Sequence, residues 1–269
     1  MMDNLTTDLM TLLPEIIVLA MAMSILLISL FLKPKQKVIN YILAQISLAV
    51  VAFAIINTHT ETVNYAFSDM FVDDTLSDVL KLMMVVATSI MLVYTRQYMQ
   101  LRNLFKGEYY ALVLFGLLGM MIMVSGQNLI SIYMGLELLS LCLYTLVAFD
   151  RDNPKSTEAA MKYFVLGALA SGLLLYGMSM IYGVTGSLNI SEIATSLTQG
   201  NFNRNVLTLG LVFIVSGLAF KFGAVPFQMW VPDVYEGAPT HITLFIGSVP
   251  EFAAFAIAIR LLAQGLESL

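Results

Sequence analysis

The chain has 269 residues, of which 59% are hydrophobic and only 12% are charged, and its mean hydropathy is +0.84. Soluble domains are about half apolar and about one-quarter charged, so this composition excludes an ordinary soluble enzyme and indicates an integral membrane protein. The net charge of −5 identifies no partner, because charges in such proteins are sorted by membrane side. No basic tract suggests nucleic acid, and the single Cys142 excludes an internal disulfide or a cysteine-built cluster.

In chain order, eight apolar runs are long enough to cross a membrane, and we predict an all-α polytopic membrane protein. The predicted spans are residues 12–32, 38–56, 79–94, 109–124, 129–149, 159–184, 206–220 and 242–262. A polar, acidic loop over residues 59–78 separates the second span from the third. Ile190, Ile193, Ala194 and Leu197 have the spacing of a short amphipathic helix that lies on the outer membrane surface.

The basic residues predict how these spans are oriented. Acidic residues precede the first span and lysines follow it, which is the wrong polarity for a cleaved signal peptide. Eight basic residues then fall on the inner side, and three lie near span ends on the outer side. The inner set is Lys33, Lys35, Lys37, Arg96, Arg102, Lys106, Arg151 and Lys155, and the outer set is Lys81, Arg204 and Arg260. The positive-inside rule therefore predicts that both termini lie outside.

The seventh span contains a lysine beside a helix break. Its apolar run continues to Phe220, so Lys221 lies about 22 Å of helix into the span, near the middle of the membrane. Gly223 offers flexibility and Pro226 lacks a backbone donor, which predicts a kink or interruption just beyond the charge. Broken helices at membrane depth need protein or water around them, so a lysine there indicates an ion pathway.

Four ionisable residues at membrane depth are the candidate site residues, namely Glu137, Lys162, Lys221 and Glu251. Each costs about 2.5–3.5 kcal/mol at a helix centre and needs a partner or water. A row of carboxylates and amines can hold and release a proton, because opposite charges favour ionised forms while burial favours neutral ones. We therefore predict a proton relay. The alternatives are a helix-packing cluster at Glu137, snorkelling of Lys162 to the inner interface, and a structural role for Glu251 at a kink after Pro250.

The two histidines suggest no metal site. His59 and His241 have the surroundings of loop or interfacial residues, and neither has a second ligand at metal spacing. We expect no metal and no cofactor in this chain, since nucleotide-binding, haem and iron–sulfur motifs are missing from the sequence.

Several motifs contain these same residues. They are Leu12-Leu-Pro14-Glu15-Ile16, Gly135-Leu-Glu137-Leu-Leu-Ser140-Leu, Glu158-Ala-Ala-Met-Lys162-Tyr-Phe, Tyr182-Gly-Val-Thr-Gly186-Ser, and Phe220-Lys221 through Pro232-Asp-Val-Tyr-Glu-Gly-Ala-Pro239-Thr240. Together they closely resemble the subunit N (subunit 2) family of proton-pumping NADH:quinone oxidoreductase, complex I. The related antiporter-like subunits of membrane-bound hydrogenases and Na⁺/H⁺ antiporters fit the other segments less well.

The resemblance implies about fourteen spans built from two inverted five-helix repeats. Residues 1–108 would form three N-terminal helices, and residues 109–269 would form the first repeat, with its broken helix around residues 221–226. Glu137, Lys162 and Lys221 match the family's relay residues. Three positions depart from the family pattern: Gln228 replaces a histidine, His241 a proline, and Glu251 a lysine that passes protons to the second repeat. That second repeat is not in this chain.

The leading hypothesis is a redox-silent, proton-translocating subunit of this enzyme, in a bacterial inner membrane with its N-terminus outside. The resemblance implies other membrane subunits and the lipid bilayer as partners. NADH, FMN, iron–sulfur clusters and quinone would belong to the rest of the complex. Two alternatives stay open, a truncated paralogue that serves as a membrane scaffold without pumping, and a Na⁺/H⁺ antiporter subunit.

Overall fold

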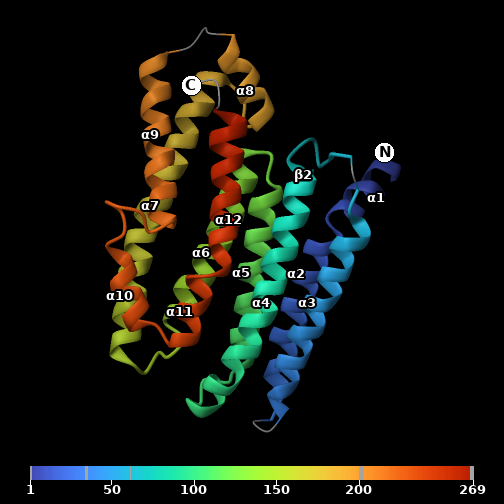
Figure 1. Cartoon of the computed structure of the whole chain (residues 1–269), viewed down its shortest axis with the longest axis vertical. Helices are drawn as coiled ribbons and strands as arrows, with labels where there is room; N and C mark the ends of the chain where they lie inside the picture. The colour runs from blue at the N-terminus through green and yellow to red at the C-terminus, as the bar shows by residue number, and fades with distance from the viewer. Residues whose placement is uncertain (1, 34–35, 61, 200–202, 267–269) are drawn as a thin grey trace.

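The protein, represented by a computed structural model, is described over residues 2–33, 36–60, 62–199 and 203–266. Within these ranges eight helical segments are long and apolar enough to cross a membrane, so the predicted all-α membrane fold and its eight spans are confirmed. The long helices run side by side, and both ends of the chain lie at the same end of the bundle (Figure 1). Lys35, one of the predicted inner lysines, lies outside the described residues.

The helices and strands follow the predicted order, with a hairpin inserted after the second span. They are α1 (Met2–Thr11), α2 (Leu13–Phe31), α3 (Val38–Thr58), β1 (Asn64–Ala66), β2 (Phe71–Asp73), α4 (Thr75–Leu101), α5 (Gly107–Ser125), α6 (Leu129–Val147), α7 (Pro154–Thr185), α8 (Ile190–Thr198), α9 (Arg204–Lys221), α10 (Trp230–Gly237), α11 (Thr240–Ile246), α12 (Val249–Ala258) and the π-helix η2 (Ile259–Gly265).

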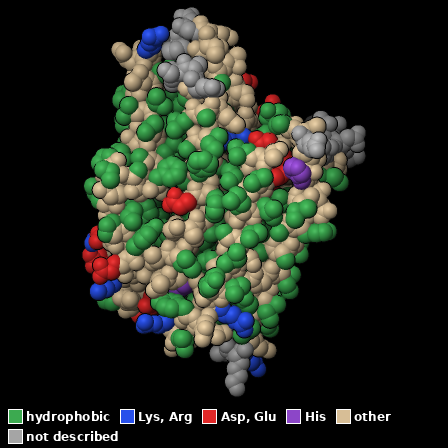
Figure 2. All heavy atoms as spheres, viewed as in Figure 1, with side chains coloured by type: hydrophobic (Ala, Val, Ile, Leu, Met, Phe, Trp, Pro, Cys, Tyr) green, Lys and Arg blue, Asp and Glu red, His purple; other side chains and the backbone are tan. Residues whose placement is uncertain are grey.

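Helix α5 occupies the centre of the bundle and is the most buried of the spans. It contacts α2, α4, α6 and α12. Its approach to α6 is close, because a methyl group on Gly119 would lie 2.6 Å from the carbonyl oxygen of Gly135. Small residues that allow such contact are typical of helix packing in membranes. The face seen in Figure 2 is mostly apolar, with few charged side chains.

The acidic loop predicted between the second and third spans contains a β-hairpin. Strands β1 and β2 pair antiparallel, with Tyr65 opposite Val72. Helix α4 then begins at Thr75, four residues before the predicted start at Val79. Asp74 caps it, accepting a hydrogen bond from the Ser77 backbone N–H at 2.8 Å while its own N–H donates to the Ser77 hydroxyl at 2.9 Å. This capping box between Asp74 and Ser77 is a local sequence signal for a helix start.

The eighth predicted span is divided. Helix α11 ends at Ile246 and α12 begins at Val249, with a break at Gly247 and Ser248. Pro250 lies in the first turn of α12, where it offers no backbone N–H to a preceding turn. A kink was expected after Pro250, but the structure has a helix interruption that precedes Pro250. This interruption places Glu251 in the first turn of a new helix, α12.

The predicted amphipathic helix forms as α8, but it does not expose its apolar side to the membrane surface. Ile190, Ile193 and Leu197 are buried, and α8 packs against α7 and η2. The expectation of a surface-bound helix is therefore corrected. The same spacing of apolar residues suits burial against protein as well as contact with lipid.

Two of the three basic residues predicted near the outer span ends lie in the interior. Lys81 is 1% exposed and Arg260 is 2% exposed. The Arg260 guanidinium donates two hydrogen bonds to the Asp74 carboxylate, at 2.8 and 2.9 Å, and a third to the Val124 carbonyl at 2.9 Å. It thus joins η2 to the start of α4 and the end of α5. A span end in sequence is not always exposed in the folded bundle.

Candidate functional site

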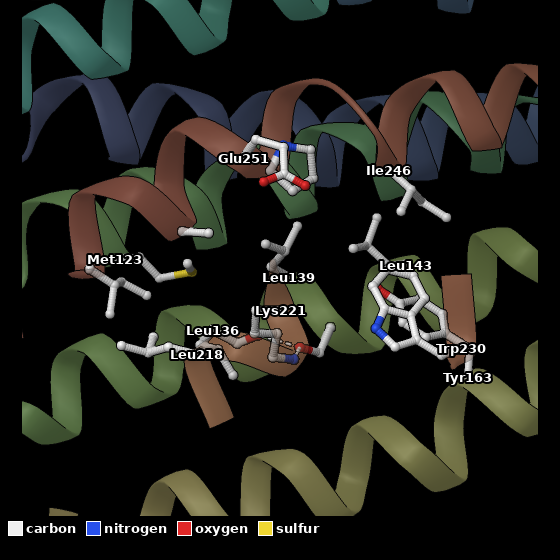
Figure 3. A pocket seen from close by; sticks show the side chains of 14 residues that line it. Met123, Leu136, Leu139, Leu143, Tyr163, Leu218, Lys221, Trp230, Ile246 and Glu251 are labelled. Carbon is white, nitrogen blue, oxygen red and sulfur yellow. Dashed lines mark hydrogen bonds between the residues drawn. The ribbon is translucent and has the colours of Figure 1, made fainter. Parts of the chain in front are cut away.

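Lys221 is the last residue of α9, and its side chain reaches into the bundle toward α6. Its ammonium donates a hydrogen bond of 2.7 Å to the Ser140 hydroxyl, marked by the dashed line in Figure 3. Ser140 in turn donates to the Leu136 carbonyl at 2.7 Å. The lysine predicted to lie beside a helix break is therefore held by a polar contact across two spans.

Glu137 lies on α6, less than one turn before Ser140, and its charge attracts the Lys221 ammonium. One carboxylate oxygen, Oε1, is buried and has no hydrogen-bond partner among the described residues. An unsatisfied buried oxygen is a position where a proton or a water molecule is favourable. Glu137 and Lys221 therefore lie near one another, but the ammonium bonds to Ser140, and among the described residues it forms no ion pair with Glu137 within 4.0 Å.

The chain after Lys221 leaves the helical conformation and resumes it at Trp230, the first residue of α10. The Phe220 carbonyl near the end of α9 accepts two hydrogen bonds, one from the Gly223 N–H at 3.0 Å and one from the Trp230 indole at 2.9 Å. The Trp230 ring stacks on Tyr163 of α7, with the centroids 4.7 Å apart. These contacts position α10 after the interruption.

A cavity of about 40 Å³ lies between Lys221 and Glu251. That volume holds about three or four water molecules at roughly 10–15 Å³ each. Leu139 lies between the two charged side chains in Figure 3, and Trp230 and Tyr163 line one end. Glu251 itself is exposed on the protein surface. Figure 2 shows acidic atoms midway along an otherwise mostly apolar face.

Lys162 is placed differently from the other three predicted residues. Its side chain is 43% exposed and forms ion pairs with Glu158 at 2.9 Å and with Asp233 of α10 at 3.0 Å. A polar surface groove of about 170 Å³ contains these residues together with Lys155 and Glu236. The structure therefore brings Lys162 to α10 and not to Lys221. An exposed position toward one end of α7 is what the snorkelling alternative expects.

Two of the positions that depart from the family pattern carry unsatisfied polar atoms. The side-chain oxygen of Gln228 is buried without a hydrogen-bond partner in the described part of the chain. Both ring nitrogens of His241 are also buried and lack a hydrogen-bond partner there. His241 is only 2% exposed, and its ring lies 5.1 Å from Tyr109 and 5.5 Å from Tyr98. The expectation of a loop or interfacial His241 is therefore corrected.

A further buried charge pair was not predicted. Glu15 of α2 and Lys81 of α4 form an ion pair of 2.8 Å, with side-chain exposures of 4% and 1%. Glu15 lies in the first turn of α2, close to the start of the first span, and it was not among the four ionisable residues singled out within the spans. Its partner was not singled out either, because Lys81 lies close to a span end. Across the described ranges, no group of three or more His, Cys, Asp or Glu side chains is placed to hold a metal ion.

Residues 126–266 match the family model described as NADH:quinone oxidoreductase/Mrp antiporter, TM. The chain is 65% identical to NADH-quinone oxidoreductase subunit N of Methylovorus glucosotrophus over 266 residues, which cover 98% of this chain and 55% of that protein. It is 56% identical to the subunit N of Thiobacillus denitrificans, over 95% of this chain and 53% of the relative. The chain thus spans about half the length of the curated relatives it matches.

Solved structures agree on the fold. Respiratory complex I from Thermus thermophilus contains a chain that superposes with a TM-score of 0.77 at 31% identity, over 92% of this chain and 52% of that one. A chain of the Mrp complex from Dietzia superposes with a TM-score of 0.78 at 20% identity, over 97% of this chain and 49% of that one, which shows the fold alone. Because the family model matches more than half of the 269 residues, the chain belongs to the NADH:quinone oxidoreductase/Mrp antiporter transmembrane family.

Proposed function

We propose that this chain is a redox-silent, proton-translocating part of a bacterial NADH:quinone oxidoreductase. The observation that carries the proposal is the Lys221 ammonium, held at the end of a broken span by Ser140 and attracted by Glu137. An ionisable group in such a place is typical of ion pathways in membranes. The similarity to relatives named NADH-quinone oxidoreductase subunit N supports the choice of enzyme.

The mechanism is electrostatic. When the Glu137 carboxylate is close, it stabilises the charged form of Lys221, and when it is displaced, burial favours the neutral amine. Lys221 then gives up a proton to water in the cavity that it shares with Glu251. Ser140 steers the ammonium, since its hydroxyl accepts the bond from Lys221. A small displacement of α6 relative to α9 is enough to move the proton, because opposite charges act strongly within about 4–6 Å.

Lys162 has a supporting part in this proposal. Its ion pair with Asp233 joins α7 to α10. The same two helices are joined again where the Ser156 hydroxyl donates a hydrogen bond of 2.8 Å to the carbonyl of Gly237, the last residue of α10. These bonds hold α10 after the break that follows Lys221. Any motion of α10 is thereby linked to the charge on Lys162.

The wider setting belongs to the same proposal. The protein crosses the bacterial inner membrane several times, with its N-terminus on the outer side, as the excess of basic residues on the inner side favours. Residues 1–108 contribute three N-terminal transmembrane helices, and residues 109–269 form the first antiporter-like repeat. Other membrane subunits and lipid surround it. NADH, FMN, iron–sulfur clusters and quinone are bound elsewhere in the complex.

A direct test uses inverted membrane vesicles from cells that make this protein. Adding NADH should acidify the vesicle interior, a protonophore should abolish that acidification, and replacing sodium with potassium should leave it unchanged. Sodium uptake driven by a pH gradient without NADH would instead identify an antiporter. NADH oxidation without any acidification would favour the scaffold alternative and contradict the proposal.

Glu251 offers a second test, because a carboxylate that shares the cavity with Lys221 stabilises the ammonium and so holds the proton on Lys221. Changing Glu251 to Lys restores the charge usual in the family and should raise proton transfer above the native rate. The matched variant Glu251→Gln removes the charge and keeps the shape, so it separates charge from packing. Dye-monitored acidification by vesicles measures both. If the lysine variant is inactive while the native protein pumps fully, Glu251 is itself a working relay carboxylate and the family comparison fails at this position.

A further inference from the structure

A surface groove of about 240 Å³ lies at the hairpin end of the bundle, where strands β1 and β2 join α3 to α4. The two helices run side by side up to that end (Figure 1). Apolar side chains of both helices line this hairpin groove, namely Ile55 and Ile56 of α3 and Val79 and Leu82 of α4. The groove is separate from the Lys221 site, and the proposed mechanism does not use it.

The apolar part of the hairpin groove belongs to the membrane-facing surface. Ile56 and Val79 are 62% and 50% exposed, and both lie in helices that are candidate membrane spans. Phe53 and Val86 are exposed further along the same helices, at spacings that place them on the same faces. A recess between apolar side chains offers a water molecule too few hydrogen-bond partners. A hydrocarbon chain that enters from the bilayer is therefore the better occupant.

The polar part of the hairpin groove contains His59, Thr75 and Asp78. Nδ1 of His59 lies 2.6 Å from the Asp78 carboxylate, which holds the ring in place. Among the described residues, Nε2 of His59 makes no hydrogen bond, and the exposed Thr75 hydroxyl makes none either. A charged imidazole donates from both ring nitrogens, and a hydroxyl also donates. The groove thus offers two free donors for an anionic oxygen, the kind that a phosphate group carries.

The charges at the hairpin end select the kind of headgroup. Residues 69–78 contain four aspartates, and of these Asp74 is neutralised by Arg260 at 2.8 Å. His59 supplies the basic group of the groove itself, and its side chain is 43% exposed. The remaining carboxylates repel a headgroup with a net negative charge, whereas they attract the ammonium of a zwitterionic headgroup whose phosphate contacts His59. These surroundings therefore favour a zwitterionic phospholipid over an anionic one.

We propose that the hairpin groove binds one zwitterionic phospholipid, with an acyl chain along Ile56 and Val79 and with its phosphate hydrogen-bonded by His59 and Thr75. Contact between the acyl chain and apolar side chains gives little preference by itself, because lipid tails are as apolar as the protein surface they touch. The two donors at the polar end therefore supply the selectivity, and the groove sets the position of the chain. The site does not depend on Lys221 or on proton pumping.

Lipid binding to the purified full-length protein in detergent micelles tests the site without any transport assay. The probe is phosphatidylethanolamine with a photoreactive diazirine in one acyl chain. Native mass spectrometry should show one lipid that binds more tightly than the rest, and photolabelling should place it on the end of α3 and the start of α4. Phosphatidylglycerol with the same acyl chains has an anionic headgroup and should bind more weakly. His59→Ala should weaken binding of phosphatidylethanolamine about tenfold, the effect of losing a hydrogen bond to a charged group.

Val79→Trp fills the groove without touching the polar end and should abolish the label there. The matched control is Val86→Trp, which adds the same side chain at an exposed position of α4 outside the groove and should be labelled as the native protein is. If His59→Ala does not fold by circular dichroism, the comparison of these two tryptophan variants decides. A label spread evenly over the lipid-facing helices, equal binding of the two lipids, or an undiminished label in Val79→Trp would overturn the proposal.

Discussion

Lys221→Ala should lower NADH-driven proton transfer on the order of tenfold or more, since a positioned proton carrier contributes about 10²–10⁴-fold. The variant removes the ammonium that bonds to Ser140 and leaves Glu137 without its counter-charge. Assembly should be retained, because alanine is a good helix former and the position is the last residue of α9. Vesicle acidification, divided by the amount of assembled protein, measures the effect.

Lys221→Arg should also impair proton transfer, although it keeps the positive charge. Guanidinium holds its proton at any physiological pH, so it can pair with Glu137 but cannot release a proton into the cavity. Lys155→Ala is the matched control, because it removes a lysine whose side chain is 75% exposed, and it should pump normally. Normal pumping by assembled Lys221→Ala would exclude Lys221 as the centre of the relay.

Arg260→Ala should lower the free energy of unfolding by about 3–5 kcal/mol, the range found when one partner of a buried ion pair is removed. Arg260 is 2% exposed and makes two hydrogen bonds to Asp74 and one to Val124. Its loss leaves the Asp74 carboxylate largely buried and frees the Val124 carbonyl. Equilibrium unfolding in mixed detergent micelles measures the change.

The same pair makes stability depend on pH. Burial raises the pKa of Asp74, but the hydrogen bonds and charge of Arg260 and the bonds from Ser77 outweigh it, and the net pKa is below the ordinary 3.8. A carboxyl with a depressed pKa contributes stability above its unfolded pKa of about 3.9, and loses it as pH falls through the lower folded value. Native protein should therefore lose this contribution below about pH 4, whereas Arg260→Ala should show a smaller acid dependence.

Two companion variants separate the ion pair from other effects of Arg260. Arg204→Ala removes an exposed arginine at the start of α9 and should change stability by no more than about 0.5 kcal/mol. Asp74→Asn combined with Arg260→Met removes both charges while the asparagine keeps the helix cap, and it should recover part of the loss. If Arg260→Ala is as stable as Arg204→Ala, the ion pair between Arg260 and Asp74 does not hold η2 to the start of α4.

Hydropathy was sufficient for the main architecture. Eight apolar runs gave eight spans, because a membrane helix needs about 20 apolar residues whatever its neighbours are. Lys221 and Glu137 were also accessible from the sequence, since a charge within a span must be compensated and therefore marks a site. The hydroxyl of Ser140 as the partner of Lys221 was not accessible, because that contact joins residues 81 positions apart.

The exposure of charged residues near span ends could not be predicted from the sequence. Counting them by membrane side treats each one as facing water, yet Lys81 and Arg260 are buried in ion pairs. Conversely, Lys162 was expected within a span and is partly exposed on the bundle surface. Local sequence determines which segments become helices, through hydropathy, caps and helix breakers that act within a few residues. Which carboxylate meets which amine is decided only when helix faces meet, because α2 must pack beside α4, and η2 beside α5, before Glu15 can reach Lys81 or Asp74 can reach Arg260.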